Sequence, residues 1–365
     1  MKITRIETFA RPEVALARIT TDGGHFGWGQ IATTEAADIV AQTLHRQIAP
    51  VVLGQNPEEY EAIEQSVLEA TLKFPGSYLC RGLAAVDTAL LDLLARKADL
   101  PVCGLFGGDT EPVAVYGSSM SREITPEDEA ARMVRLRDER GFRAFKVRAG
   151  TVAGHNRDPW PNRTRTLIPT VRKALGDDIV IHADGNSCYT PDKALEVGRM
   201  LEEYNFGHFE EPCPYWEMDW TRTVTEKLRI PVAGGEQDNY MPAWRQMIRN
   251  HVVDIAQPDI CYIGGFTRAL QVAHMAAEYG MPCTPHSANH SLVTVFTLHL
   301  FKVMPNSGPF LEFSIEDQSL YQPMYSPALE AKEGCVALPA EGAGWGVTIS
   351  EEWLAGSAYL KSELE

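Results

Sequence analysis

The first hundred residues combine strand-like and helix-like patterns of apolar positions. Apolar and polar residues alternate over Lys2–Phe9 and Ala15–Thr21, with the period of two that is typical of a β-strand. Three later stretches, Ala36–Ile48, Pro57–Leu72 and Leu79–Ala98, repeat apolar residues every three or four positions. That spacing places the apolar side chains on one face of a helix. We therefore predict an α+β fold for this part of the chain.

A glycine-rich segment ends that pattern and marks a predicted domain boundary. Residues 101–108 have the sequence PVCGLFGG, in which a proline and several glycines break the helical periodicity. We therefore predict an N-terminal α+β domain over residues 1–111.

Beyond residue 111, short apolar strands alternate with helix-length segments. The candidate strands are Val113–Tyr116, Ala144–Arg148, Ile179–Asp184, Gly207–Glu210, Val232–Glu236, Val253–Asp259, Pro282–His286 and Phe310–Phe313. Helical patterns between them lie over Glu127–Glu139, Thr164–Leu175, Pro191–Glu203, Thr267–Glu278 and Leu292–Val303. Eight such units over roughly 200 residues predict an α/β fold, a (β/α)8 TIM-type barrel over residues 112–330. A doubly wound open sheet is the alternative, but no GxGxxG follows the first strand.

The net charge narrows the classes of partner. The 365-residue chain has 33 Lys and Arg residues against 49 Asp and Glu residues, which gives a formal charge of −16. A surface of that sign repels nucleic acids and anionic membranes, so we expect neither as a partner. An acidic small-molecule substrate remains compatible, because a local cationic pocket or a metal ion can override the net field.

The cysteines and the N-terminus predict a cytoplasmic protein. The seven cysteines are scattered without a CxxC pair, which is typical of reduced thiols and not of a disulfide framework or a zinc site. Residues 1–6 alternate like a strand and lack the apolar core of a signal peptide. No uninterrupted apolar run approaches about 18 residues, so we expect no membrane-spanning segment.

Three acidic residues end consecutive predicted barrel strands. Asp184, Glu210 and Glu236 are separated by 210 − 184 = 26 and 236 − 210 = 26 residues, so each lies one strand–helix unit beyond the last. Three carboxylates at one barrel mouth repel one another unless a cation neutralises them. An all-oxygen set suits a hard ion, Mg2+ first. The alternative is that they are unrelated acids that cap the following helices.

Two cations lie on the second predicted barrel strand. Alternation places Lys146 and Arg148 on the same face, pointing into the barrel, with Val147 facing the helices. Two positive charges beside three carboxylates are electrostatically favourable. The alternative is a structural set of ion pairs inside the barrel.

The last three predicted strands end in a further group of polar residues. Asp259 ends strand six and His286 ends strand seven, and neighbouring strands can place a carboxylate on an imidazole nitrogen. Such a contact orients the ring and raises its basicity. Strand eight contributes Glu312, for which an ordinary place on the rim is the alternative.

Together these pieces resemble the mandelate racemase subgroup of the enolase superfamily over nearly the whole chain. The matching segments are KVR on strand two, HADGN on three, FEEP on four, GGE on five, QPD with the following IGG on six and PH on seven. FGWG, LFGG and the late GAGWGVTI also resemble the capping domain of that family. The resemblance implies that residues 1–111 are the capping domain and that residues 331–365 return to it.

The resemblance also implies roles for the site residues. The implied ligands of one Mg2+ per subunit are Asp184, Glu210 and Glu236. The metal would bind and polarise the carboxylate of a small-molecule substrate, while Asp259 and His286 act as an acid/base dyad. Glu312 would hydrogen-bond the same carboxylate as enediolate charge develops. A proton next to a carboxylate is a very weak acid, so that charge requires stabilisation by the metal and by cationic neighbours.

One departure from the family pattern favours dehydration. Members that use both faces of the substrate have Lys-x-Lys on strand two, whereas Arg148 stands at the second position here. A guanidinium is a poor general base at neutral pH, so racemisation by two opposed bases is disfavoured. We expect His286 to remove the α-proton of a sugar acid, and the β-hydroxyl to leave. Lys146 is the other candidate base, because we expect Arg148 to lower its pKa.

The sequence also suggests which residues contact the substrate, and it leaves other functions open. Asn186 is a candidate substrate-binding residue beside Lys146 and Glu312, although a turn-stabilising role is equally compatible. The first strand pair encloses almost no loop, so we expect a lid from Lys73–Tyr78 or from another subunit, and hence a homo-oligomer. An epimerase, a lactone cycloisomerase and a non-catalytic paralogue that binds sugar acids remain alternatives. A metal-dependent barrel hydrolase or aldolase could also use three carboxylates, but it would not need the Asp259–His286 pair with Lys146.

Overall fold

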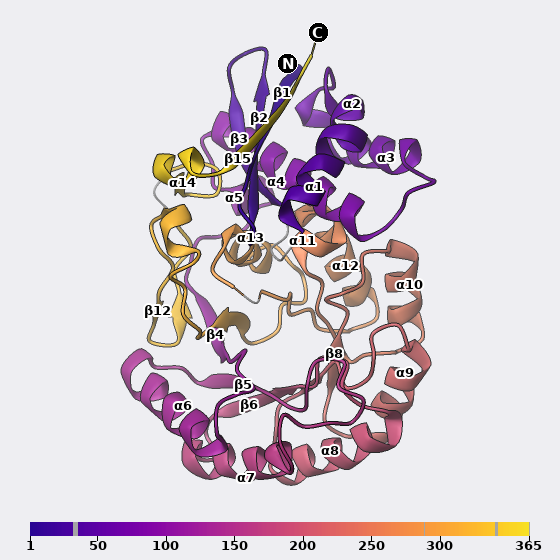
Figure 1. Ribbon diagram of the computed structural model, residues 1–365, viewed down its shortest axis with the longest axis vertical. Coiled ribbons are helices and arrows are strands. Elements are labelled where there is room, and N and C mark those ends of the chain that lie inside the picture. Colours follow the sequence, from indigo (N-terminus) through magenta and orange to yellow (C-terminus); the bar gives the residue numbers. More distant parts are fainter. Residues whose placement is uncertain (32–35, 288, 340–341, 365) are drawn as a thin grey trace.

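The N-terminal sheet contains four antiparallel strands, one of which comes from the other end of the chain. The computed structural model describes residues 1–31, 36–287, 289–339 and 342–364 (Figure 1). The strands of this sheet are β1 (Ile3–Ala10), β2 (Ala15–Thr21), β3 (Phe26–Ile31) and β15 (Ala358–Glu363). Their order is β15-β1-β2-β3, so the last strand covers the outer edge of the first.

The helix α4 (Ser77–Ala98) packs directly on β3. A Cβ atom at Gly29 would lie 2.1 Å from the carbonyl oxygen of Ala85, and one at Gly27 would lie 2.2 Å from that of Ala89. The FGWG segment therefore needs glycine at both positions, because only glycine allows the strand to approach the helix backbone this closely. The other helices of this part are α1 (Ala37–Thr43), a π-helical turn (Leu44–Ile48), α2 (Ala49–Val52), a 3-10 turn (Pro57–Glu59), α3 (Tyr60–Ala70) and α5 (Val102–Leu105).

Seven parallel strands form the wall of the barrel. They are β4 (Val113–Ser118), β5 (Ala144–Arg148), β6 (Val180–Asp184), β7 (Phe209–Glu210), β8 (Val232–Gly234), β9 (Ile255–Ala256) and β10 (Leu311–Ser314). Each of β4 to β8 pairs with the next strand in parallel, and β10 pairs with β4. This is the predicted α/β barrel with an N-terminal capping domain.

The seventh predicted strand, Pro282–His286, contains one isolated bridge instead of a regular ladder. Cys283 bridges in parallel to Ala256 on one side and to Ser307 on the other. Pro282 and Pro285 have no backbone N–H, so a continuous ladder cannot form across them. The segment still occupies the position between β9 and β10 and carries His286 to the barrel mouth.

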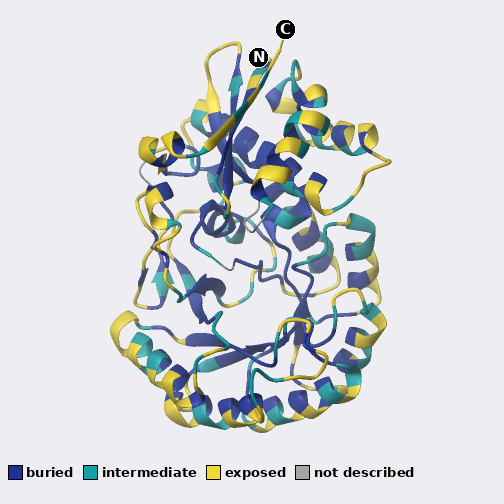
Figure 2. Ribbon diagram, in the orientation of Figure 1, coloured by how far each residue is buried: buried dark blue, intermediate teal, exposed yellow. Residues whose placement is uncertain are grey.

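Helices surround the barrel and bury their apolar faces against it (Figure 2). They are α6 (Pro126–Arg140), α7 (Arg163–Leu175), α8 (Pro191–Glu203), α9 (Met218–Lys227), α10 (Met241–Arg249), α11 (Ile260–Ile263), α12 (Phe266–Glu278) and α13 (Leu292–Phe301). The five helices predicted in this region agree with the structure to within two residues at each end. Within the described ranges, no helix combines the length and apolarity needed to cross a bilayer.

The C-terminal segment contacts both parts of the molecule. The remaining elements are a 3-10 turn (Gln322–Met324), β11 (Tyr325–Ser326), β12 (Ala331–Lys332), β13 (Cys335–Val336), β14 (Thr348–Ile349) and α14 (Glu351–Ala355). β13 pairs with β4 at the barrel. The buried Trp345 donates from its indole Nε1 to the carbonyl oxygens of Trp28 and Thr88 in the N-terminal part. The domain bounds 1–111, 112–330 and 331–365 stay a prediction.

Candidate active site

The parallel register of the barrel brings the predicted site residues together. Arg148 on β5 is opposite Asp184 on β6, and Asp184 is opposite Glu210 on β7. Because the carboxyl ends of barrel strands open on one face, their side chains converge there. Lys146 and Glu312 join this group from β5 and β10 and are fully buried.

Lys146 lies at the centre of a buried carboxylate cluster. Its Nζ is 2.5 Å from Glu210 Oε1 and 2.7 Å from Glu312 Oε1. Asp184 Oδ2 is 3.7 Å away. Burial lowers the pKa of Lys146, but the two glutamates outweigh burial and raise it above its usual range. The prediction of a lowered Lys146 pKa is therefore wrong here, since the effect of Arg148 is smaller than that of the carboxylates.

The ionised state of Glu312 follows from the same contacts. Burial raises the pKa of Glu312, but Lys146 and then His286 outweigh this and lower it to about 2. Its Oε1 accepts from the hydroxyl of Ser118 at 2.7 Å, and its Oε2 accepts from the backbone N–H of Ser287 at 2.9 Å. Glu312 is thus a fixed, fully ionised acceptor beside the ammonium.

Asn186 connects Asp184 to Arg148. Its backbone N–H donates to Asp184 Oδ1 at 2.7 Å, and its Nδ2 donates to Asp184 Oδ2 at 3.2 Å. Arg148 forms an ion pair with Asp184 Oδ2 and donates to Asn186 Oδ1 at 3.0 Å. Both ends of the Asn186 amide are therefore engaged within the protein, and its substrate-binding role stays a prediction.

Glu236 differs from the other two predicted metal ligands. Its Oε1 accepts from Gln237 Nε2 at 3.1 Å, whereas its buried Oε2 has no hydrogen-bond partner among the described residues. Glu210 is fully engaged, because its Oε2 accepts from Gln257 Nε2 at 2.8 Å. Glu211 Oε1 is also buried without a partner in the described chain, and burial followed by Glu236 and Glu210 raises the Glu211 pKa well above its usual range. Three glutamates this close together raise the cost of ionising one another, so a cation placed among them is favourable.

The oxygen donors of these three residues suit a hard divalent ion, although their carboxylates are not arranged around one common point. In the described part of the chain, no three His, Cys, Asp or Glu side chains are arranged to hold a metal ion. The reason is that Asp184 and Glu210 are turned towards Arg148 and Lys146. All three predicted ligands are oxygen donors on neighbouring strands, and Glu236 Oε2 has no hydrogen bond to a described residue, so this donor set suits Mg2+.

His286 and Asp259 form a buried pair on the opposite side of the mouth. His286 Nδ1 is 2.8 Å from Asp259 Oδ2, and Asp259 Oδ1 accepts from the backbone N–H of Tyr262 at 3.0 Å. His286 Nε2 lies 3.5 Å from Glu236 Oε2. Burial lowers the pKa of His286, but Glu236 and then Asp259 outweigh it and raise it to about 10. Because Nδ1 is occupied by its hydrogen bond to Asp259, Nε2 is the ring nitrogen that faces Glu236 and Glu312.

Arg122 also reaches the site, although its sequence pattern does not reveal it. It lies in the loop after β4, where its Nε donates to the carbonyl oxygen of Gly150 at 3.0 Å and its Nη2 donates to Asn186 Oδ1. Burial and then Arg148 lower the Arg122 pKa to about 10. No spacing rule predicts this contact, because it joins loops that follow three different strands.

The predicted lid segment Lys73–Tyr78 lies on the capping domain side. Phe74 is 69% exposed, so none of the described residues buries its ring. The start of α4 contacts the loop after β8, where Cys80 Sγ donates to the carbonyl oxygen of Asn239 at 3.5 Å. The segment is thus close to the barrel rim, and its role as a lid stays a prediction.

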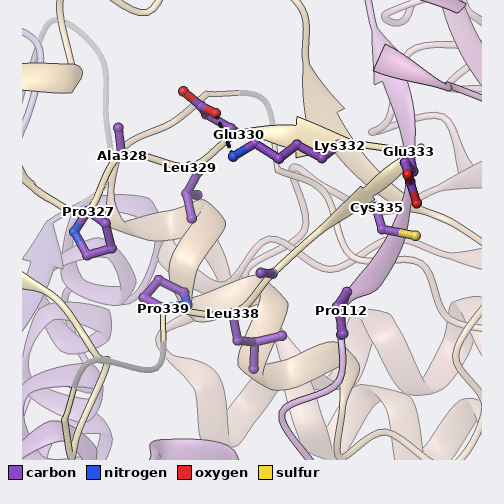
Figure 3. Close-up of a pocket in the computed structure, with 11 residues that line it drawn as sticks. Pro112, Pro327, Ala328, Leu329, Glu330, Lys332, Glu333, Cys335, Leu338 and Pro339 are labelled. Carbon is purple, nitrogen blue, oxygen red and sulfur yellow. Dashed lines mark ion pairs between the residues drawn. The ribbon is translucent and has the colours of Figure 1, made fainter.

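A groove of about 680 Å3 lies elsewhere, beside the β12–β13 hairpin. Figure 3 shows Glu330 and Lys332 paired on its rim, with Pro112, Leu338 and Pro339 along its walls. None of its lining residues belongs to the carboxylate cluster or to the His286–Asp259 pair. The groove is therefore separate from the candidate active site.

Two family sequence models match the chain. Residues 2–107 match the mandelate racemase / muconate lactonizing enzyme N-terminal domain, and residues 128–353 match the enolase C-terminal domain-like family. An arabinonate dehydratase from Saccharolobus solfataricus is 28% identical over 93% of this chain and 89% of its own length. A D-galactarolactone cycloisomerase from Agrobacterium fabrum is 30% identical over 95% and 91%.

Solved structures match over the full length. A protein from Roseobacter denitrificans, provisionally described as a racemase, is 50% identical with a TM-score of 0.97 over all of both chains. A mandelate racemase/muconate lactonizing protein from Paracoccus denitrificans PD1222, complexed with magnesium, is 25% identical with a TM-score of 0.87. That match covers all of this chain and 98% of the other.

Proposed function

Because the chain belongs to the mandelate racemase / muconate lactonizing enzyme family of the enolase superfamily, we propose that it is a Mg2+-dependent dehydratase of sugar acids. The observation that carries the proposal is the buried His286–Asp259 pair facing the Lys146-centred carboxylate cluster. The arabinonate dehydratase among its relatives supports the hydro-lyase class. The magnesium in a solved relative supports the choice of metal.

Metal binding would use the three strand-end carboxylates Asp184, Glu210 and Glu236. When bound, Mg2+ supplies Lewis-acid polarisation of the substrate carboxylate and stabilises negative charge that develops on it. Lys146 contributes a second positive charge beside these carboxylates. Glu312 is ionised beside the Lys146 ammonium, so it would donate a hydrogen bond to the substrate carboxylate only after it takes up a proton.

Proton transfer falls to His286 in this proposal. Its Nε2 takes the proton from the carbon next to the carboxylate, and the electron pair of that C–H bond forms the enediolate. Nε2 must be unprotonated for this step, and Mg2+ on Glu236 would offset the carboxylate charge that does most to raise the His286 pKa. Asp259 holds Nδ1–H and stabilises the imidazolium that results. When the enediolate collapses, the C–O bond to the β-hydroxyl breaks, and the hydroxyl leaves as water with the proton from Nε2. The remaining enol then becomes a 2-keto-3-deoxy acid.

Arg148 supports a one-base reaction. Its guanidinium is engaged by Asp184, Asn186 and the carbonyl oxygen of Ser119. A guanidinium in this position keeps its proton at neutral pH and does not serve as a base. Epimerisation through a base at this position is therefore disfavoured.

A lactone cycloisomerase is the second candidate, because a relative of that activity is 30% identical. It would use the same α-proton abstraction but open a ring instead of releasing water. Product analysis separates the two, because only dehydration gives a 2-keto-3-deoxy acid from an open-chain substrate.

The first prediction is that His286→Asn abolishes Mg2+-dependent formation of 2-keto-3-deoxy acids from a library of sugar acids. Loss of the base should lower kcat by at least about 1000-fold, and chelation should have the same effect. The matched control is His251→Asn, since His251 Nε2 also contacts a carboxylate, Asp254 Oδ1, at 2.7 Å but on the surface. A library without any turnover, or a fully active His286→Asn enzyme, would contradict the proposal.

A further inference from the structure

The shortest contact between a cation and an aromatic ring among the described residues joins the capping domain to the barrel. The guanidinium carbon of Arg81, in the second turn of α4, lies 3.7 Å from the centre of the Tyr262 ring in α11. The other contacts of this kind are 4.9 Å or longer. Arg81 Nη1 is buried without a hydrogen-bond partner in the described chain. A cation that has lost its water is attracted more strongly by a ring face, so this contact restrains the Tyr262 ring.

Tyr262 is in turn linked to the His286–Asp259 pair. Its backbone N–H donates to Asp259 Oδ1 at 3.0 Å, while Asp259 Oδ2 is 2.8 Å from His286 Nδ1. The centres of the Tyr262 and His286 rings are 6.0 Å apart. One carboxylate is thus held by Tyr262 through one oxygen and by His286 through the other. A shift of Tyr262 therefore changes the orientation of the imidazole.

The element that carries Tyr262 is too short to keep its shape alone. α11 contains only the four residues Ile260–Ile263, with Asp259 as its N-cap. A single helical turn is unstable without tertiary contacts. α11 packs against α4, where the two parts of the molecule meet (Figure 1). Just beyond α11, a Cβ atom on Gly265 would lie 2.4 Å from Asp87 Oδ2, so the chain touches α4 there as well. The position of Asp259 therefore depends on the capping domain.

Arg81 is also joined to the predicted lid segment Lys73–Tyr78. Its Nε donates to Ser77 Oγ at 3.0 Å, and Ser77 is both part of that segment and the first residue of α4. One side chain thus connects the segment to the ring beside the His286–Asp259 pair.

We propose that Arg81 is a positioning residue for the proton transfer: it holds Tyr262 and, through Tyr262 and Asp259, aims His286 Nε2 at the substrate. The inference rests on the proposed function, in which His286 is the base. Arg81 touches neither the substrate nor the metal in this assignment. A displacement of about 1 Å at the reacting atoms can lower a rate by about 100-fold, so loss of the contact lowers kcat and not substrate affinity.

The first test needs no substrate. In the Mg2+-loaded protein, the 1H NMR signal of the His286 Nδ1–H proton reports its hydrogen bond to Asp259, and the absence of the signal in His286→Asn identifies it. Arg81→Met should shift or broaden the signal, and Arg81→Lys, which keeps the charge, should alter it less. Arg18→Met is the matched control, because Arg18 also covers a ring, that of Trp28 at 5.3 Å, but within the capping sheet. It should leave the signal unchanged.

The second test uses turnover. Arg81→Met should lower kcat by about 10- to 100-fold while KM changes less than about 3-fold, and Arg81→Lys should recover part of the loss. Tyr262→Leu should cause a similar loss, and the double substitution should lose no more than either single one, because both remove the same contact. Tyr262→Phe, which keeps the ring, should lose less. Arg18→Met should keep its kcat even where its melting temperature falls as far as that of Arg81→Met.

Four results would overturn the inference. These are a His286 signal that is undetectable in the unsubstituted protein or unchanged in Arg81→Met, a raised KM with unchanged kcat, additive losses in the double variant, and an equal loss of kcat in Arg18→Met. The proposed function is scored separately. The expected NMR changes without dehydration of any sugar acid would leave the role of Arg81 standing and remove the proposed function. Dehydration that is insensitive to Arg81→Met would do the reverse.

Discussion

Glu236 is the one predicted metal ligand whose carboxylate has an oxygen left without a hydrogen bond by the described residues. Asp184 and Glu210 are already neutralised by Arg148 and Lys146. Glu236 has only the His286 ring as a charged neighbour, with Nε2 3.5 Å from its Oε2, and no hydrogen bond holds that oxygen. We therefore expect Glu236 to turn to a metal ion most readily of the three. At the scale of single residues, Glu236 is therefore the ligand whose substitution should reduce Mg2+ affinity most clearly.

Replacing Glu236 by Gln should weaken Mg2+ binding by on the order of 10- to 100-fold or more, because the substitution removes a full charge and one anionic donor. Calorimetric titration of Mg2+ into the protein measures this directly. Mg2+ should also raise the melting temperature of the unsubstituted protein more than that of the variant. Glu203→Gln, on the exposed side of α8, is the control, and an unchanged Kd in Glu236→Gln would refute this role.

At the residue scale, some contacts of the site can be predicted from the sequence and others cannot. The equal spacing of Asp184, Glu210 and Glu236 predicts a convergence that follows from strand register alone. The engagement of both ends of the Asn186 amide, and the approach of Arg122 to it, depend on loops without any period. The raised pKa of Lys146 likewise depends on Glu210 and Glu312, which come from strands distant in sequence. Residue spacing does not tell whether their effect on this pKa is larger or smaller than the opposing effect of Arg148.

At the scale of elements, the contact between β3 and α4 depends on two glycines. Gly29→Ala should destabilise the protein by about 2 kcal/mol or more, because its Cβ would meet backbone atoms that cannot move aside. Thermal unfolding measures the loss. Gly23→Ala in the preceding turn is the matched control, since its Cβ would come no closer than 3.4 Å to another residue. Equal melting temperatures for the two variants would refute the packing argument.

A second element-level contact joins α4 to α12. Thr267 Oγ1 donates to Asp87 Oδ1 at 2.5 Å, and the backbone N–H of Thr267 donates to Oδ2 at 3.3 Å. Burial raises the pKa of Asp87 to about 7 against the opposing effect of Thr267. In the unfolded chain the same carboxyl has its ordinary pKa of about 3.9. Between these values the folded protein retains a proton that the unfolded chain has lost.

This contact predicts a pH dependence of stability. The contribution of Asp87 is fully present below about pH 4 and is lost as the pH rises through about 7, by roughly 4 kcal/mol at most. Asp87→Asn removes the titration, so its melting temperature relative to the unsubstituted protein should increase between pH 5 and pH 8. Asp219→Asn, on the exposed start of α9, should show no such trend. A difference that is constant with pH would contradict the linkage.

The strand-seven segment marks a limit of prediction at the element scale. Most barrel strands and helices follow from period and length, because their side chains alternate or repeat regularly. In Pro282–His286 the same apolar content predicts a strand, yet the two prolines remove the donors that a ladder needs. Position in the barrel was predictable here, whereas regular hydrogen bonding was not.

At the scale of the whole molecule, the two parts are joined by contacts distant in sequence. Trp345 hydrogen-bonds Trp28 and Thr88, and its backbone N–H donates to Asp92 Oδ1 at 2.9 Å. The resemblance of GAGWGVTI to the capping domain predicts the return of the chain, but only the fold supplies the partners. Subunit association, which we expected from the short first loop, stays a prediction.

The pairing of β15 with β1 has a consequence for synthesis on the ribosome. Ala10 and Ala358 are partners in this ladder, yet 358 − 10 = 348 residues separate them. At about 5–20 residues per second, the outer edge of β1 waits roughly 20–70 s for its neighbour. Throughout that time it is an open strand edge of the kind that recruits other chains. Among the strand pairings of the described residues, this one leaves a strand edge open for the longest stretch of synthesis.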